Sequence, residues 1–439
     1  MNKRWLVISH AFNMDGRAAS NTVTDKIPYL LKNEIQLIVL SAVTGLKDEK
    51  LEHYQLLPWG PSGLRFDFRH WFANKYGRGF SYKFFTGLMS AILSPFIFLE
   101  RFFLGLSSQS SWAIPAFLKG YQLVKNNRVD LVYTAASAWS AHLVGYWLKR
   151  VTGVIWIAEV HDPMVIRINE HSDGSEPQKN RDKKFIQKLE EKICTHADLV
   201  WWFTDGALHY AKKRQPQLGD RGFVVCTGAE PPGRFDPLPM SHAYQDTLNI
   251  AHFGSLANDR SLSPALFALH KLIKVNPDSK DLIKIHVYGS SLDELSRAAI
   301  KDLSLEHMVI LHGRVEFDPV TQKTGRERIM EIMRKSDVLL GIQGDTRWCA
   351  EYIPSKFYEY FYTNRPTWGI SHLNDQLDHL LRERNAYISH TLDQNSIYSC
   401  LNEIWNDWYS KNLRVAPYLP ISTELSVETI LARVAALSK

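Results

Sequence analysis

Short apolar segments alternate with helix-like segments along most of this chain, and this alternation limits its fold more than any other feature. The first series of apolar segments lies at residues 5–9, 35–40, 130–134, 154–160, 199–203 and 223–226. Segments with helical periodicity, such as Phe185 to His196, separate the later members of the series. Continuous apolar strands with helices between them predict an α/β fold built on a parallel sheet.

A turn-rich stretch that begins at Glu230-Pro231-Pro232-Gly233 interrupts the alternation, which resumes at Leu248. The second series of apolar segments lies at residues 248–253, 284–289, 309–313, 338–341 and 367–370. Because domain boundaries fall in exposed linkers rich in Pro and Gly, the pattern predicts two domains, at residues 1–235 and 236–418. A last helical stretch lies within residues 419–439.

The composition is that of a globular protein, since 45% of the 439 residues are hydrophobic and the mean hydropathy is -0.23. The 52 Lys and Arg against 46 Asp and Glu leave a net charge of +6, which attracts phosphates or an anionic membrane without requiring nucleic acid. Four Cys without a CxxC pair argue against a disulfide scaffold. We therefore expect a cytoplasmic protein that begins with a strand rather than a signal sequence.

Several apolar segments of the second series end at a glycine. Gly289 and Gly313 are the last residues of such segments, and Gly254 follows one directly. In an α/β sheet ligands bind at the carboxyl ends of the strands, where a glycine lets the backbone come close to them. For any single glycine an ordinary tight turn is the alternative, but the three together indicate a ligand site at this edge.

The segment Pro354-Ser355-Lys356 carries the strongest local signal for chemistry. Pro354 suits the first turn of a helix, so a helix is expected to begin near Ser355 and Lys356. The free N–H groups and positive end of that helix, with the Ser355 hydroxyl and the Lys356 cation, favour a diphosphate. Glu359, one turn later, can accept hydrogen bonds from two ribose hydroxyls. The alternative is an ordinary amphipathic helix with solvated charges.

These motifs, in this order, resemble the C-terminal lobe of family 4 glycosyltransferases. The matching segments are Phe253-Gly254-Ser255-Leu256, His286-Val287-Tyr288-Gly289-Ser290, Leu311-His312-Gly313-Arg314-Val315, Tyr352 to Tyr360 and Asn364-Arg365-Pro366. The resemblance extends over Leu248 to Ile370. It implies the GT-B fold, in which two Rossmann-like lobes with parallel sheets face a central cleft and the second lobe holds a nucleotide-sugar. It also implies that the helix at 419–439 crosses back to the N-terminal, acceptor-side lobe.

The resemblance assigns further residues of the second lobe to the donor site. Glu351 precedes Glu359 by eight positions, the E-x7-E spacing of retaining members, and is expected on the loop before Pro354, near the transferred sugar. The remaining candidates would approach the phosphates (Gly254, Ser255, Arg260 and Gly289) or frame the base (Gly313, Arg314 and Val315). For Arg260 an ordinary surface arginine is the alternative.

In the first lobe, polar residues follow a strongly apolar strand. His161 and Asp162 come directly after residues 154–160, at the carboxyl end where a ligand is expected. His161 would bond the donor sugar or the acceptor, and Asp162 would orient it. A strand-ending Asp-Pro turn is the alternative. The early loop around Gly16 would approach the donor.

Residues 65–106 combine basic, aromatic and apolar side chains. Such a composition suits a monotopic segment on the cytoplasmic face of a membrane, which would collect a lipid-linked acceptor. Pro95, Glu100 and Arg101 interrupt the apolar run and argue against a spanning helix. A core helix with a flap of the N-terminal lobe is the other interpretation, and the sequence leaves both open.

The chain has no D-x-D and no H-E-x-x-H motif, so no metal site is predicted and no cofactor besides the nucleotide-sugar is expected. Taken together, these features predict a metal-independent, retaining glycosyltransferase that transfers a hexose or related sugar from a nucleotide diphosphate to a glycan or lipid-linked glycan. A nucleotide-sugar epimerase or hydrolase of the same fold is one alternative. A catalytically silent, membrane-associated partner in a glycan assembly complex is another.

Overall fold

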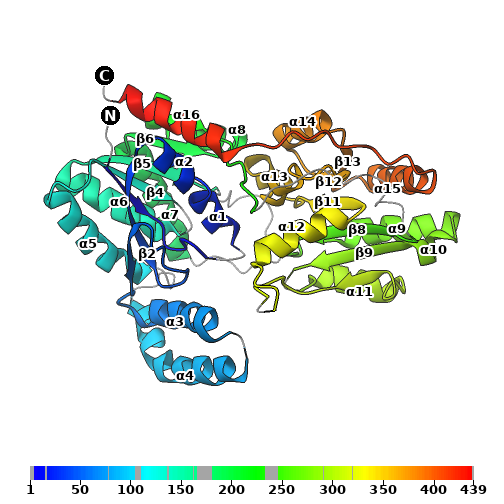
Figure 1. The fold of residues 1–439 in the computed structure, drawn as a ribbon, viewed down its shortest axis with the longest axis horizontal. Coiled ribbons are helices and arrows are strands. Elements are labelled where there is room, and N and C mark those ends of the chain that lie inside the picture. The colour runs from blue at the N-terminus through cyan, green and yellow to red at the C-terminus, as the bar shows by residue number, and fades with distance from the viewer. Residues whose placement is uncertain are drawn as a thin grey trace. The chain divides into compact units, whose positions relative to one another are not determined.

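The chain forms two compact units in a computed structural model (Figure 1). The structure describes residues 4–14, 17–77, 79–103, 110–135, 138–161, 163–165, 180–232, 246–289, 291–318 and 320–437. Of these, residues 4–165, 180–227 and 423–437 belong to the first unit, and residues 228–422 belong to the second. Each unit holds one sheet of parallel strands covered by helices, which confirms the predicted α/β fold.

The first sheet has seven strands in the order β3-β2-β1-β4-β5-β6-β7. Its strands are β1 (Arg4–Ile8), β2 (Gln36–Ala42), β3 (Glu52–Leu56), β4 (Leu131–Ala135), β5 (Ile155–Val160), β6 (Leu199–Trp202) and β7 (Gly222–Val224). All neighbouring strands run parallel. Helices bury both faces of this sheet, which is why its central strands are apolar without alternation.

The helices of the first unit form two layers. One face of the sheet packs against α5 (Ala113–Lys125), α6 (Trp139–Thr152), α7 (Asn180–His196) and α8 (Asp205–Arg214). The other face packs against α1 (Ala18–Thr24), α2 (Ile27–Lys32) and α16 (Thr423–Ala436). The last helix of the chain therefore completes the core of the first unit.

Two further helices, α3 (Pro61–Tyr76) and α4 (Phe80–Phe103), form a hairpin that extends from the rest of the first unit at the bottom of Figure 1. Among the described residues, α4 is the one helix that is long and apolar enough to cross a membrane by length and composition. Only 11% of its most apolar stretch is buried. The interpretation of this segment as a core helix is therefore wrong, because α4 packs on α3 along one side and leaves most of its apolar residues exposed.

The second sheet has six parallel strands in the order β10-β9-β8-β11-β12-β13. Its strands are β8 (Leu248–Phe253), β9 (Ile283–Tyr288), β10 (Val309–Leu311), β11 (Val338–Ile342), β12 (Thr367–Ser371) and β13 (Tyr387–His390). One face packs against α9 (Ser263–Val275), α11 (Glu294–Asp302) and α15 (Gln394–Tyr409), and the short α10 (Ser279–Leu282) precedes β9. The other face packs against α12 (Gly325–Lys335), α13 (Lys356–Tyr360) and α14 (Asp375–Glu383).

The strand order decides where a ligand site is expected in each unit. The chain order reverses between β1 and β4 in the first sheet and between β8 and β11 in the second. At such a point the helices leave the sheet on opposite faces, and the space beyond the carboxyl ends of the two strands stays open. Helix α13 reaches this point because Gly341 of β11 has no side chain; a Cβ there would lie 2.2 Å from Cζ of Phe357.

Candidate functional site

The loops after β8 and β9 touch each other through their backbones. The N–H of Gly254 donates to the carbonyl oxygen of Tyr288 at 2.9 Å. A Cβ added to Gly289 would lie only 2.1 Å from the carbonyl oxygen of Gly254, so position 289 requires glycine. Ser255, the next residue, is exposed. Two of the predicted glycines therefore meet at the carboxyl edge of the second sheet.

Glu359 lies between two cations beside this edge. Its Oε2 is 2.6 Å from Nζ of Lys356, and its Oε1 is 3.4 Å from Nε of Arg326 on α12. Glu359 is buried, which alone would raise the pKa of its carboxyl group. The positive charges of Lys356 and Arg326 outweigh this effect and hold the pKa below its ordinary value. The cluster of these three residues therefore carries a net positive charge.

The helix that carries Lys356 and Glu359 begins where the sequence predicts but is short. Helix α13 runs from Lys356 to Tyr360, and the Ser355 side chain makes no capping bond. Within the described chain the backbone N–H groups of Ser355 and Lys356 donate no hydrogen bond, whereas that of Phe357 donates to Pro354. A five-residue helix has only a small dipole, so side chains supply most of the positive charge here.

His252 belongs to the same region and was missed by the sequence analysis. Its Nδ1 lies 3.1 Å from the carbonyl oxygen of Leu340, which can only accept, so Nδ1 carries the proton. Burial, with the nearby charges of Arg260 and Lys356, lowers the pKa of His252 to about 4. The ring is therefore neutral near pH 7, and its buried Nε2 is an acceptor without a hydrogen-bond partner among the described residues.

The other predicted residues of the second unit lie in different surroundings. Arg260 is half-buried and closes a tight turn, in which its N–H donates to the carbonyl oxygen of Ala257 at 2.8 Å. Glu351 is not on a loop, as expected, but ends a short 3-10 helix at Arg347–Glu351 and is buried. The last three, Gly313, Arg314 and Val315, follow β10 at the outer edge of the sheet, two strands from β8. Thus the charges of Arg260 and Lys356 act on His252, and Glu359 joins them through Lys356, whereas no contact links the residues after β10 to this cluster among the described residues.

In the first unit, His161 belongs to a buried polar network centred on Glu159. Nε2 of His161 lies 2.8 Å from Oε1 of Glu159, and Nζ of Lys26 lies 3.1 Å from Oε2. Tyr133 and Trp201 donate to Oε2 at 2.7 and 3.1 Å. Burial would raise the pKa of Glu159, but Lys26 and these hydrogen bonds outweigh it and lower the pKa to about 2. Glu159 is therefore a fully buried carboxylate with four donors.

This network sets the orientation of His161. Because the Glu159 carboxylate only accepts, Nε2 of His161 carries a proton and Nδ1 is the other ring nitrogen available for a ligand. Nδ1 is buried and has no hydrogen-bond partner among the described residues, and the ring stacks on Phe203 at a centroid distance of 5.1 Å. Asp162 and Gly16, the other two residues predicted for this lobe, lie outside the described residues.

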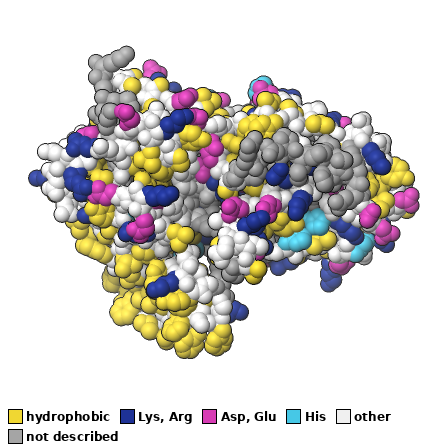
Figure 2. Space-filling model, in the orientation of Figure 1, with side chains coloured by type: hydrophobic (Ala, Val, Ile, Leu, Met, Phe, Trp, Pro, Cys, Tyr) yellow, Lys and Arg dark blue, Asp and Glu magenta, His cyan; other side chains and the backbone are white. Residues whose placement is uncertain are grey.

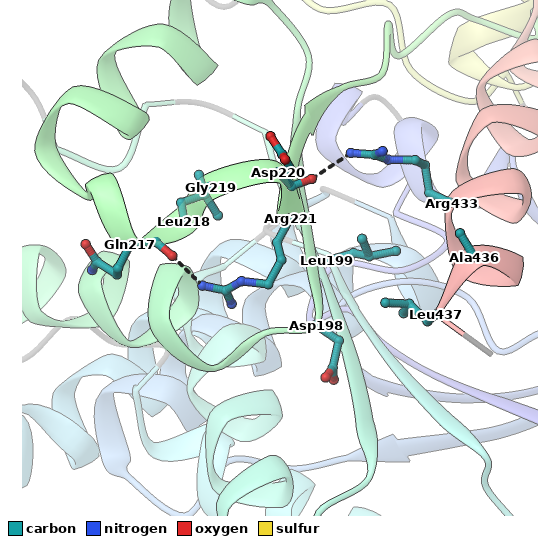
Figure 3. Close-up of a pocket in the computed structure, with 10 residues that line it drawn as sticks. All are labelled: Asp198, Leu199, Gln217, Leu218, Gly219, Asp220, Arg221, Arg433, Ala436 and Leu437. Carbon is teal, nitrogen blue, oxygen red and sulfur yellow. Dashed lines mark hydrogen bonds between the residues drawn. The ribbon is translucent and has the colours of Figure 1, made fainter. Parts of the chain in front are cut away.

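One cavity of the first unit lies away from this network (Figure 3). It has a volume of about 360 Å³ and is lined by Asp198, Leu199 and residues 217–221, with Arg433 and Leu437 of the C-terminal segment. Arg433 donates to the carbonyl oxygen of Asp220 at 2.7 Å across it. Leu199 is the first residue of β6, so the cavity lies at the amino end of that strand, opposite to the edge where ligands bind in such sheets.

No three His, Cys, Asp or Glu side chains of the described ranges gather into a group that could hold a metal ion.

No protein-family model and no curated protein sequence matches this chain. Several solved structures match it over nearly their whole length. HepE of Anabaena in complex with UDP-glucose is 11% identical, with 99% of each chain covered and a TM-score of 0.54. The α,α-trehalose 6-phosphate synthase of Burkholderia multivorans is 11% identical, with 100% of each chain covered and a TM-score of 0.57. The lipopolysaccharide outer core galactosyltransferase WaaB is 10% identical, with 99% of each chain covered and a TM-score of 0.53.

These solved structures share an architecture of two Rossmann-like lobes. The coverage extends over the whole length of both chains in each case, so the likeness includes both units and not one sheet alone. About 10% of the residues are identical between this chain and these structures, so the similarity establishes the fold. The chain has the GT-B fold.

Proposed function

We propose that this protein is a glycosyltransferase that uses a nucleotide-sugar donor. The observation that carries the proposal is the cluster of Lys356, Glu359, Arg326 and His252 beside the carboxyl ends of β8 and β11. The cluster combines a net positive charge for a diphosphate with a buried carboxylate and a buried imidazole nitrogen for hydroxyl groups. Solved proteins of the same fold include HepE, which binds UDP-glucose, and a galactosyltransferase.

In this proposal each group of the cluster has a role in donor binding. Lys356 and the N–H groups of Ser355 and Lys356 bind the diphosphate, while Arg260 adds positive charge beside it. Glu359 accepts hydrogen bonds from the ribose hydroxyls. Its two carboxylate oxygens have more lone pairs than Lys356 and Arg326 occupy. His252 Nε2 accepts from one hydroxyl of the nucleotide-sugar.

The transfer itself breaks the bond between C1 of the sugar and the diphosphate oxygen and forms one between C1 and an acceptor hydroxyl oxygen. Charge grows on the departing diphosphate, where Lys356 and Arg260 stabilise it without a metal ion. The acceptor's proton leaves to a base or to water. We further infer a hexose as the transferred group and family 4 membership with retained configuration, on the resemblance and the spacing of Glu351 and Glu359.

The acceptor is proposed to be a glycan, free or lipid-linked, as in polysaccharide biosynthesis. In this proposal His161 of the first unit contacts the acceptor; what supports it is that Glu159 holds the Nε2–H of His161 and leaves Nδ1 as a nitrogen that can accept a proton. Gly16 and Asp162 keep their expected roles beside the donor and the acceptor.

Calorimetric titration with UDP and UDP-glucose tests the donor site. Lys356→Ala should weaken UDP binding about 10- to 150-fold, because it removes charge-assisted bonds worth about 1.5–3 kcal/mol. Lys335→Ala is the matched control, since Lys335 is an exposed lysine at the last turn of α12. Equal UDP affinity in folded Lys356→Ala and Lys335→Ala would remove the cluster from the donor site.

Product analysis with a labelled donor separates transfer from the alternatives. A transferase needs a glycan acceptor to release UDP rapidly and retains activity in excess EDTA. A hydrolase releases free sugar without an acceptor, and an epimerase returns an isomerised nucleotide-sugar. A chain that binds no nucleotide favours the alternative of a silent partner in an assembly complex, and that result contradicts the proposal.

A further inference from the structure

The α3–α4 hairpin presents an apolar surface that the described residues of the first unit leave largely exposed; at its edge, Phe85 touches Phe72 of α3 at a ring-centroid distance of 5.5 Å. Figure 2 shows hydrophobic side chains gathered over this hairpin, at the bottom of the view. Phe80 is 85% exposed and Phe103 is 72% exposed. The other large apolar side chains of α4 that are exposed are Phe84, Phe85, Leu88, Ile92, Phe96, Phe98, Leu99 and Phe102. We refer to these ten side chains as the apolar face of α4.

The apolar face is continuous around one side of the helix. With about 100° between successive residues, its members fall in one sector of about 160°. Thr86 and Ile97, which are buried, point away from that sector. Soluble helices turn their apolar stripe to the core. In α4, by contrast, the apolar face points away from the core. This side of the helix is therefore suited to contact with an apolar partner.

The charges around the apolar face are basic. Lys83 and Arg101 are both exposed and stand 18 residues apart, about five helical turns, so they lie on the same side of α4. On a helical wheel, the side that carries Lys83 and Arg101 lies next to the apolar face. Helix α3 adds Arg69 and Lys75, both exposed. A row of cations along the edge of an apolar face complements anionic phosphates above an acyl layer.

The two acidic residues of the hairpin turn inward. Asp67 is fully buried, and Oε2 of Glu100 accepts the N–H of Ser62 at 2.8 Å, at the start of α3. The exposed charges of the hairpin are therefore of one sign. Two copies of this chain that met through their apolar faces would bring like charges together, whereas an anionic bilayer would not.

The position of α3 also decides the orientation. The 24 residues of α4 would span about 36 Å, which is long enough to cross a bilayer. However, α3 packs along one side of α4 and carries Arg65, Arg69 and Lys75, which would then enter the hydrocarbon. A helix with one side packed on basic protein and the other side apolar fits the plane of the membrane interface instead.

We propose that the α3–α4 hairpin docks this protein in the interface of a bilayer that contains anionic lipids. The apolar face of α4 enters the acyl region, while Lys83 and Arg101 contact the lipid phosphates. This inference rests on the hairpin alone and holds whether or not the proposed sugar transfer is correct.

Vesicle flotation of the full chain tests the proposal. The protein should float with phosphatidylcholine vesicles that contain phosphatidylglycerol, less with phosphatidylcholine alone, and less at high salt. Replacing Lys83 and Arg101 by Gln should weaken partitioning about 30-fold, about fivefold for each charge. A variant with Phe84, Leu88, Ile92 and Phe96 changed to Ser should not float. Its matched control changes Phe267 and Leu295, which are 51% and 50% exposed in the second unit, to Ser.

A single-site probe covers the case in which the multiple Ser variant does not fold. An environment-sensitive fluorophore on Ile92→Cys should shift to the blue when anionic vesicles are added, and the same label on Phe267→Cys should not. Three results overturn the proposal: equal flotation of the Ser variant and its control, no vesicle binding by the unaltered chain, or a discrete dimer without lipid that the four Ser replacements dissociate. The last result would assign the apolar face to a second copy.

Discussion

The buried pair of Glu159 and Lys26 offers the sharpest test of the network that orients His161. Both residues are fully buried, and Nζ of Lys26 lies 3.1 Å from the carboxylate. In Glu159→Gln the amide keeps the size of the side chain and its carbonyl oxygen still accepts from Tyr133 and Trp201. The lysine, however, stays buried without its counter-charge. We expect a large loss of stability in the first unit and a change in the environment of His161.

Two independent magnitudes agree on the size of the loss. Breaking a buried ion pair by removing one partner typically costs about 3–5 kcal/mol. The pKa of Glu159 falls from 4.5 to about 2, a shift worth about 3 kcal/mol at 1.36 kcal/mol per unit. Because the folded-state pKa is depressed, this stabilisation is present above pH 4.5 and is lost as the pH falls toward 2.

Hydrogen exchange of the β5 amides measures this loss separately from the second unit. The free energy of opening at pH 7 should fall by about 3–5 kcal/mol in Glu159→Gln and stay unchanged in the control Glu191→Gln, an exposed acid of α7. Adding Lys26→Met should recover much of the loss, because both charges are then absent. If Glu159→Gln lowers the free energy by less than about 1 kcal/mol, and Lys26→Met adds its full separate effect, the two charges are not coupled and the reasoning fails.

Three more predictions concern single side chains. Glu359→Gln should weaken UDP-glucose binding about tenfold by calorimetry and lower the melting temperature, because Lys356 and Arg326 lose their counter-charge; unchanged values would contradict both roles. His252→Phe keeps a ring but removes the Nε2 acceptor and the Nδ1–H bond to Leu340, so UDP-glucose affinity should fall about 3- to 10-fold and the melting temperature should fall as well; equal affinity would exclude His252 from the site. Burial raises the pKa of Asp67 to about 7, so its ionisation destabilises the fold as the pH rises from 4 to 7, and Asp67→Asn should gain about 4 kcal/mol on the unaltered chain over that range in urea unfolding. A constant difference between the two unfolding free energies would show that Asp67 does not titrate in this way.

Most strands could be predicted because central strands of these sheets are buried on both sides. The two that were missed, β3 and β13, are edge strands. Their sequences, Glu-His-Tyr-Gln-Leu and Tyr-Ile-Ser-His, contain polar residues, because an edge strand keeps one side toward solvent. A continuous apolar run identifies a central strand, but these two edge strands contain no such run.

The sequence predicted members of the cluster around Glu359 that are neighbours in sequence, and missed members that are not. Lys356 and Glu359 lie one turn apart on a helix, so their spacing alone predicts their contact. Arg326 reaches the same carboxylate from α12, and no motif connects the two positions. Likewise, Tyr133 and Trp201 meet Glu159 only through the register of β4, β5 and β6. Composition also cannot tell an exposed apolar helix from a buried one, which is why the position of α4 stayed open.

The backbone contact at Gly289 has a consequence for how this protein tolerates mutation. Any codon change that replaces this glycine adds a Cβ 2.1 Å from the carbonyl oxygen of Gly254, where it must push the two loops apart. The effect does not depend on the polarity or size of the new side chain, so a saturation library selected for function should lose all replacements at this position about equally. Gly87 in α4 offers the contrast, because a Cβ there meets no atom within 4 Å. The same selection should retain alanine at Gly87. The difference in tolerance between Gly289 and Gly87 then measures how strongly function depends on the carboxyl edge of the second sheet.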